Sequence, residues 1–192
     1  IVPQSNEGSI AIQPVRSGSD VIYVNRSGRK IYAMDFDTAG NHYASVDLTE
    51  MAIHLTATGN TFERIAWASN PASILWVQRS DGVLCSLTYR RDQQVWAWAR
   101  HPLGDGTVES VAVIPSQDGT ADDLWLIVLR TVNSVTKRYV EYLSQPFEPM
   151  SDTDTLGMSF MDSALRYQGA ATLTLTGLSH LEGKTVKVVT NG

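Results

Sequence analysis

The sequence predicts an all-β protein built from about three antiparallel, propeller-like blades, followed by part of a small β domain. In residues 73–101, apolar and aromatic residues alternate with polar residues in short runs bounded by turn residues. This is the pattern of antiparallel strands with one buried face. A strand followed by a hairpin also recurs at a period of roughly 50 residues, which is typical of four-stranded propeller blades. Three such units begin near Ile10, Phe62 and Val108.

The second unit has the clearest pattern. Its hairpin is expected to join strands at 74–79 and 83–89 through Asp81-Gly82, because an Asp-Gly pair adopts the positive φ angles of a tight turn. A further strand at 95–100 carries two tryptophans two residues apart, and alternation along a strand places them on one face.

The first and third units follow the same plan. The first has a strand at 9–15, a hairpin within 21–36 and a closing strand at 41–46. The third has a strand at 108–114 and a hairpin within 124–143. Ser-Gly and Asn-Ser pairs stand at the expected turns of these two hairpins, and such residues favour turns.

Two sets of side chains recur when the three hairpins are aligned. The aromatic set is Tyr23, Trp76 and Trp125. The basic set, just before each turn, is Arg26, Arg79 and Arg130. A repeated salt bridge or carbonyl contact between blades explains the arginines, and a basic ring around a channel is the functional alternative.

Between the first and second units the periodicity becomes helical. Asp47 and Glu50 are spaced as in a capping box. The apolar residues that share one helical face are Leu48, Met51, Ala52 and Leu55. We therefore expect a short amphipathic helix at 47–55.

The composition changes after Leu143. Residues 145–157 hold two prolines, several small polar residues and three acids, as in a linker or long loop. Short strands are then expected at 163–167, 172–176 and 184–189. We divide the chain into a propeller-like β domain, residues 1–148, and a linker with a partial small β domain, residues 149–192.

The two ends of the sequence suggest a piece of a longer protein. The first residue is not Met, and the last predicted strand runs into Asn191-Gly192, a strong hairpin signal without a return strand. A strand without its partner leaves an exposed edge, and three blades alone cannot close a propeller. We therefore expect the parent protein to continue beyond this point.

Composition and charge argue against several classes of protein. Hydrophobic residues make up 43% of the chain and charged residues 18%, which is too apolar for a disordered protein. The net charge of −5 gives no basic signature for nucleic acid. A lone cysteine, Cys85, cannot form an internal disulfide. No apolar run approaches the roughly 20 residues that span a bilayer, so we expect no membrane insertion.

No pattern predicts a catalytic, cofactor or metal site. The histidines, at none of the usual metal-ligand spacings, are His42, His54, His101 and His180. Acidic clusters at 118–123 and 152–154 lack the spaced carboxylates and closing glutamate of a calcium loop. The sequence has no Gly-x-Ser-x-Gly elbow and no glycine-rich phosphate loop. We therefore predict no enzyme activity, no cofactor and no metal.

The tryptophans admit two interpretations. They are Trp67, Trp76, Trp96, Trp98 and Trp125, all in predicted strands. An exposed set would stack on sugar rings, whereas their place in alternating strands favours packing between blades. We favour the packing role.

Four segments carry a recognisable series of motifs. They are ILWVQRSDGVL (74–84), ESVAVIP (109–115), RYVE (138–141) and GLSHLEGKTV (177–186). In this order, over almost the whole chain, they resemble the tail nozzle or stabilisation proteins of short-tailed phages and prophages. The resemblance implies a virion structural protein whose propeller-like β domains form a ring below the portal, around the DNA exit channel. It implies no catalytic residues, and members of the family are much longer than this chain.

These observations lead to one hypothesis and two alternatives. The hypothesis is a structural tail component of a phage or prophage, located in the virion, that forms part of the DNA ejection conduit. Its expected partners are copies of itself in a ring and other tail proteins, without sequence-specific binding of nucleic acid. The first alternative is a free-standing β-propeller that binds carbohydrate on its tryptophans, which glycan-array binding would favour. The second is a propeller hydrolase, which a carboxylate cluster at the blade centre would favour.

Overall fold

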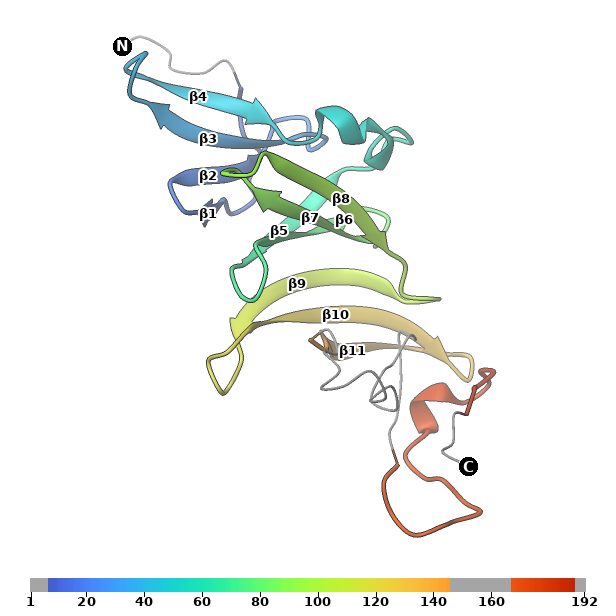
Figure 1. The fold of residues 1–192 in the computed structure, drawn as a ribbon. Helices are drawn as coiled ribbons and strands as arrows, with labels where there is room; N and C mark the ends of the chain where they lie inside the picture. Colours follow the sequence, from blue (N-terminus) through green and yellow to red (C-terminus); the bar gives the residue numbers. More distant parts are fainter. Residues whose placement is uncertain (1–6, 146–166, 189–192) are drawn as a thin grey trace.

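The computed structural model describes residues 7–145 and 167–188. It confirms the all-β class, because these residues form three antiparallel sheets and only two short 3₁₀ helices. The sheets follow one another along the molecule without closing into a ring (Figure 1). Each sheet corresponds to one expected blade.

Strand order follows sequence order in every blade. Blade 1 contains β1 (Val15–Ser17), β2 (Asp20–Val24), β3 (Ile31–Asp37) and β4 (His42–Asp47). Blade 2 contains β5 (Phe62–Ala68), β6 (Ile74–Arg79), β7 (Leu84–Arg90) and β8 (Val95–His101). Blade 3 contains β9 (Thr107–Pro115), β10 (Asp122–Val132) and β11 (Val135–Leu143). The first strand begins later than predicted, since Ser9 forms only an isolated bridge.

The turns have the predicted chemistry. Gly28 and Gly82 have φ angles of 71° and 79°, which glycine adopts without steric cost. Asn133 and Ser134 both have positive φ, at 48° and 63°, as in the two-residue turns that match the twist of a hairpin.

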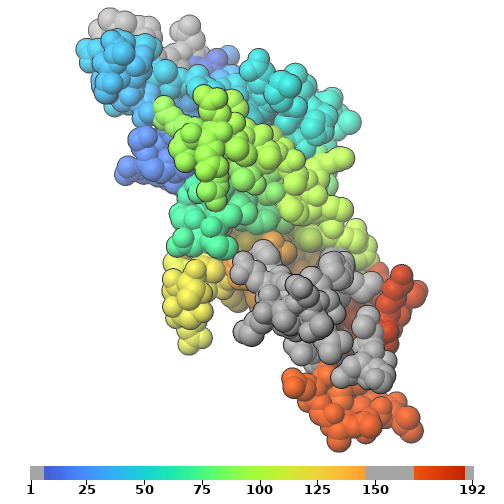
Figure 2. All heavy atoms as spheres, in the orientation of Figure 1, coloured from blue at the N-terminus to red at the C-terminus, as the bar shows by residue number. Residues whose placement is uncertain are grey.

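Consecutive blades pack face to face through two buried clusters, and the space-filling view shows them following one another along the molecule (Figure 2). Each blade has two faces. We call the face on the side of the later blades in the series its leading face, and the face on the side of the earlier blades its trailing face, and we use the same names for the outer faces of blades 3 and 1. The first buried cluster lies between blades 1 and 2 and includes Ile22, Val24, Ile31, Leu75, Val77 and Leu87. The second lies between blades 2 and 3 and includes Trp76, Leu84, Val108, Val111, Leu124 and Leu126. The apolar area removed from water at these two faces holds the blades together.

A hairpin turn of each blade holds the first strand of the next. The N–H of Phe62 donates to the carbonyl of Gly28 at 2.7 Å, and the N–H of Val108 donates to the carbonyl of Gly82 at 2.9 Å. The approach is close, because a Cβ on Gly82 would lie 2.2 Å from the Cγ2 of Thr107. Glycine is therefore required for this contact as well as for the turn.

Blades 2 and 3 open with the same three-residue pattern, Thr, apolar residue, Glu. The segments are Thr61–Glu63 and Thr107–Glu109. In both blades the apolar residue is buried, and the strand register shifts at the glutamate that follows it. Each glutamate is thus the extra residue of a β-bulge at the equivalent place, so the start of these blades is built in the same way.

The structure corrects the predicted alignment of the first hairpin by one residue. Counted from the equivalent turn residues Gly28 and Gly82, the residue in the place of Trp76 is Ile22, and not Tyr23. A shift of one residue exchanges the two faces of a strand. Tyr23 consequently lies on the trailing face of blade 1, away from the first buried cluster.

The prediction that Arg26, Arg79 and Arg130 occupy one place in each blade is wrong. Arg79 pairs with Phe62, the first buried residue of β5. In blade 3 the equivalent first residue, Val108, pairs with Val128, so Val128 and not Arg130 holds the place of Arg79. Arg79 and Arg130 each bind a carboxylate of their own blade. These salt bridges lie within single hairpins, and Arg130 also donates to the carbonyl of Leu103, in the connection between blades 2 and 3, at 3.3 Å.

The helix predicted at 47–55 is a shorter 3₁₀ element, η1 (Glu50–Leu55). The side chains that it and the preceding residues bury are Leu48, Ala52 and Leu55. Met51 is 94% exposed, so its predicted place on the buried face is wrong. The reason is geometric, because three residues per turn rotate the apolar face away from the α-helical spacing.

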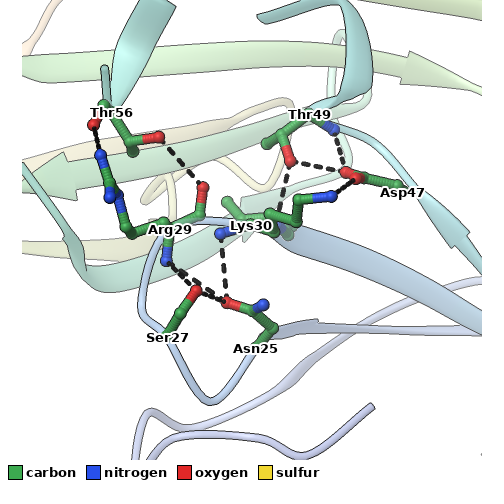
Figure 3. A network of polar contacts seen from close by, with 8 residues as sticks. Asn25, Ser27, Arg29, Lys30, Asp47, Thr49 and Thr56 are labelled. Carbon is green, nitrogen blue, oxygen red and sulfur yellow. Dashed lines mark hydrogen bonds and ion pairs between the residues drawn. The ribbon is translucent and has the colours of Figure 1, made fainter. Parts of the chain in front are cut away.

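A polar network ties the segment after β4 to the hairpin turn of blade 1 (Figure 3). The carboxylate of Asp47 accepts hydrogen bonds from the N–H and hydroxyl of Thr49, at 2.8 and 2.6 Å, and from Lys30 Nζ at 2.9 Å. The guanidinium of Arg29 donates to the carbonyl of Thr56, whose hydroxyl donates back to the Arg29 carbonyl at 3.2 Å. Asp47 therefore binds a turn instead of capping an α-helix.

Two of the predicted C-terminal strands are not formed. Residues 172–176 and 184–188 contain no strand, and the regular element in this region is the 3₁₀ turn η2 (Ser179–Leu181). Their side chains are largely exposed, and alternation without a sheet to pair with does not stabilise a strand. The strand predicted at 163–167, except for its last residue, and the hairpin signal at 191–192 lie outside the described residues. The division of the chain at residue 148 stays a prediction.

The buried face of blade 2 gives a first test. We predict that Trp76→Ala lowers the free energy of unfolding by about 3–5 kcal/mol, as for other buried aromatic residues cut to alanine. Trp96→Ala is the matched control, because Trp96 is 46% exposed on the outer strand of the same blade. Urea unfolding followed by circular dichroism measures both, and equal losses in the two variants would contradict the face assignment.

The glycine contact between blades gives a second test. Gly82→Ala should lower the free energy of unfolding by about 2–4 kcal/mol, because left-handed strain of about 1–2 kcal/mol adds to overpacking against Thr107. Gly119→Ala isolates the strain, since Gly119 has φ 69° and no atom within 4 Å of its added Cβ. The prediction fails if both variants lose the same stability in thermal melts.

Candidate functional surface

The leading face of blade 3 is apolar, and no further blade covers it in the part of the chain that the structure describes. Cross-strand pairing places Trp125 between Ala112 and Tyr142, and Ile127 beside Val140. Val140 is 72% exposed, Tyr142 60% and Ile127 39%. Apolar side chains that are exposed together mark interaction sites.

Trp125 lies on this surface at the position that corresponds to the buried Trp76 of blade 2. Trp125 lies opposite Ala112 on the first strand of blade 3, as Trp76 lies opposite Ala66 in blade 2. The alignment predicted for these two tryptophans is therefore confirmed. Trp76 packs against blade 3, whereas Trp125 packs on Tyr142 with ring centroids 5.4 Å apart. Blade 3 thus presents the kind of face against which another sheet packs.

The strand β11 is an edge in the described part of the chain. It pairs with β10 alone, whereas blades 1 and 2 each carry a fourth strand at this position. Arg138 forms a two-bond salt bridge with Glu109 at 2.6 and 3.1 Å, and Arg130 forms one with Glu141 at 2.5 and 2.8 Å. Charges on an edge strand limit non-specific pairing with other strands, so β11 combines an apolar face with a charged edge.

The tryptophans do not form one platform. Trp76 is buried toward blade 3, and Trp67 and Trp98 pack at half-burial against the first cluster. The indole N–H groups of the latter two have protein acceptors. Trp96 is 46% exposed, and Trp125 lies on the far face of blade 3. The predicted packing role thus describes three of the five tryptophans.

A buried carboxylate joins blades 1 and 2. Asp20 is 2% exposed, accepts a hydrogen bond from the Tyr89 hydroxyl at 2.6 Å and is bound by Arg91. Arg91 also donates to Asp35 at 2.5 Å. Its guanidinium lowers the pKa of Asp35, while burial and the neighbouring Asp20 raise the pKa of Tyr89. Each group has a partner, so the cluster acts as a link between blades.

The side chains considered for metal binding lie apart. Within residues 7–145 and 167–188, no three His, Cys, Asp or Glu side chains are grouped so as to hold a metal ion. Asp118 accepts hydrogen bonds from the Ser116 hydroxyl at 2.6 Å and the Thr120 N–H at 3.0 Å, which lowers its pKa to about 2. His101 lies 2.7 Å from the Ser86 hydroxyl, and burial lowers its pKa.

The structure also describes the lone cysteine and the hydropathy of the helices. Cys85 is buried in β7, and burial raises the pKa of its thiol to about 11. Among the described residues, none of the helices has the length and hydropathy needed to cross a bilayer. The acidic residues at 152–154 lie outside the described ranges.

Sequence reasoning did not find the leading face of blade 3 or the link at Asp20. The sequence predicts Trp125 in the core, because alternation marks an apolar face without showing what covers it. The link joins residues far apart in the chain, and no local signal connects Asp20 with Arg91. The longer strands of blade 3, with Val140 and Tyr142 alternating on β11, are the signal that could have indicated the surface.

No protein-family model matches this chain, and no curated protein matches it. Its class is therefore given by the architecture of the described residues, which form three β-blades in series, the third with an apolar leading face.

The link between blades 1 and 2 gives a third test. We expect Arg91→Gln to cost about 2 kcal/mol, because it leaves buried Asp20 without its cation while Tyr89 still donates. Without Arg91 the pKa of Asp35 rises toward its ordinary value. In the wild type, the stability that this lowered pKa contributes is present above the ordinary carboxyl pKa and is lost as pH falls through the lowered folded-state pKa. Arg91→Gln lacks this contribution and is therefore less stable at neutral pH.

Acid unfolding of Arg91→Gln should consequently begin at a higher pH than in the wild type. The adjacent Arg90→Gln, which removes an exposed arginine, is the control and should unfold at the wild-type pH. Circular dichroism between pH 7 and pH 2 decides the matter, and an unchanged acid transition in Arg91→Gln would contradict the role given to Arg91.

Proposed function

We propose that the chain is a structural component of a phage or prophage tail, with a nozzle-like role in the DNA ejection conduit. In this role it is located in the virion, associates with itself in a ring and contacts other tail proteins. It has no catalytic function. The observation that carries the proposal is the ordered series of motifs that resembles the tail nozzle proteins.

The position of these motifs in the fold supports a structural role. Residues 74–84 form β6 and the turn that holds blade 3, residues 109–115 lie in β9, and residues 138–141 lie in β11. Three of the four motifs thus coincide with elements that join blades or that form the end face, and the fourth, residues 177–186, contains the 3₁₀ turn η2 and no strand. Residues that hold blades together are expected in a structural protein.

An apolar end face also favours an assembled protein over a free-standing carbohydrate binder. A solitary propeller covers every blade face with another blade, whereas Trp125, Val140 and Tyr142 stand on an uncovered face of blade 3 in the described part of the chain. The tryptophans that would stack on sugars are divided among three faces. The sugar-binding alternative therefore has less support.

Particle composition tests the proposal. Virions purified by density gradient from the strain that carries this gene should contain peptides of the chain, and detached tails should contain them in the same proportion to other tail proteins. Tailless heads from the same preparation are the control. Mass spectrometry that finds the chain in the lysate and not in purified virions would overturn the assignment to the virion.

We also predict that the isolated chain binds duplex DNA weakly or not at all. Its net charge of −5 gives little attraction for phosphates, and a conduit wall functions better if it does not retain the DNA that passes it. Fluorescence anisotropy with a labelled duplex in low-salt buffer should show no change at micromolar protein. Salt-sensitive binding in that range would contradict the prediction.

A further inference from the structure

The described C-terminal residues contain a strand-like segment that belongs to none of the three sheets. Residues 172–176 read Thr-Leu-Thr-Leu-Thr, and no charged residue occurs between Gly169 and Leu178. We call residues 172–176 the Thr–Leu segment. Leu173 is fully exposed and Leu175 is 42% exposed. An uncharged segment that is rich in β-branched residues and free of proline pairs readily with an open strand.

The same chain presents an open sheet edge at β11. In blades 1 and 2, β3 and β7 pair with the fourth strands β4 and β8, whereas β11 has no such neighbour among the described residues. The fourth strands hold six and seven residues. The uncharged stretch around the Thr–Leu segment is at least as long, so its length suits a fourth strand of blade 3.

The apolar side chains of the segment match those of the edge. Val140 and Tyr142 alternate along β11 and are 72% and 60% exposed on the leading face. Leu173 and Leu175 alternate in the same way. A strand that placed these leucines beside Val140 and Tyr142 would form the cross-strand apolar pairs that stabilise a sheet.

The charges of β11 do not oppose an uncharged neighbour. Two of its three charged side chains, Arg138 and Glu141, already form salt bridges within blade 3, with Glu109 and Arg130. A strand that adds to the edge therefore leaves these pairs intact and needs no charge to match them. The threonines of the Thr–Leu segment suit the face opposite to the leucines, because threonine is favoured in strands and tolerates water.

The Thr–Leu segment stands apart from the β11 edge of its own chain. Residues 167–178 are the orange loop that extends beyond blade 3 in Figure 1. The chain that follows this loop is held by Lys184, whose ammonium group donates to Asp105 in the connection between blades 2 and 3. Each copy of the chain thus offers both a free strand-like segment and an open edge.

We propose that the Thr–Leu segment of one copy of this chain adds to β11 of a second copy and becomes the fourth strand of its blade 3. In such strand addition the main-chain hydrogen bonds give affinity, and the alternating side chains give specificity. The two surfaces differ, so the contact is heterologous and continues from copy to copy, into a ring where the rotation closes. This inference rests on the self-association part of the proposed function and names the residues that carry it.

Two substitutions test the two sides of the contact. Leu173→Glu alters the Thr–Leu segment and Val140→Glu alters the β11 edge, and each places a carboxylate against an apolar neighbour. The wild-type chain should form dimers and larger assemblies at micromolar concentration in analytical ultracentrifugation. Each substitution should raise the dissociation constant at least about tenfold.

Each substitution has a matched control. Val186→Glu is the control for the segment, because Val186 is 48% exposed in the other alternating stretch that forms no strand. Met51→Glu is the control for the edge, because Met51 is 94% exposed on η1. Both controls should assemble like the wild type. Thermal melts check folding, and monomers of Leu173→Glu and Val140→Glu should melt close to the controls, since all four residues are exposed.

Mixing the two variants shows which surfaces meet. The Val140→Glu chain keeps its Thr–Leu segment and the Leu173→Glu chain keeps its β11 edge, so one unaltered contact can form between them. The mixture should therefore contain dimers with one chain of each kind and nothing larger, because the other segment and edge of that dimer are both altered. A symmetric contact between two β11 edges would instead leave Leu173→Glu associated like the wild type, which contradicts the proposal.

A wild-type chain that stays monomeric at high micromolar concentration would overturn the inference, as happens if the chain's own residues cover β11. Assemblies that withstand either substitution would also overturn it. Its failure is distinguishable from failure of the tail assignment, because a monomeric chain that is present in purified virions contradicts only the strand addition. A self-associating chain that is absent from virions contradicts only the tail role.

Discussion

The fold depends on the fit of a leading face to a trailing face. A β-sheet with an apolar face is stabilised when that face is covered, and blade 2 obtains this cover on both faces from its neighbours in sequence. The glycine turns set the spacing of the blades, because the carbonyls of Gly28 and Gly82 bind the N–H of the residue that starts the next core. Most of the other contacts between blades follow from this spacing.

Polar links support the apolar contacts at the edges of the sheets. The Asp20 cluster joins blades 1 and 2. Asp122 of blade 3 accepts hydrogen bonds from the N–H groups of Ser69 and Asn70 at 2.7 and 3.0 Å. These links are partly exposed and contribute less than the buried faces. They fix the orientation of one blade on the next, since each needs a defined geometry.

Much of the architecture could be predicted from the sequence. The hairpin strands, the turns at Gly82 and Asn133 and the equivalence of Trp76 with Trp125 all follow from alternation and turn chemistry. Tyr23 could not be assigned to its face, because aromatic residues on either face look alike in the sequence and an error of one residue reverses the result.

The strands predicted for the C-terminal segments are not formed, for another physical reason. Residues 172–176 alternate like a strand, yet a strand forms only where a neighbouring chain pairs with it, and pairing is not a local property. The candidate surface on blade 3 could not be predicted for the same reason. The apolar residues of β11 are visible in the sequence, but whether a face is covered depends on blades far away in the chain.

The matching β-bulges at Glu63 and Glu109 have a consequence for the history of the gene. The turn glycine and the buried residue that it binds lie at fixed positions within the unit, so a duplicated unit brings its own turn, bulge and apolar faces. A tandem duplication can then lengthen the series without any change elsewhere in the protein. Variation in this lineage is therefore expected to include whole units gained or lost, with boundaries near the Thr–apolar–Glu segment.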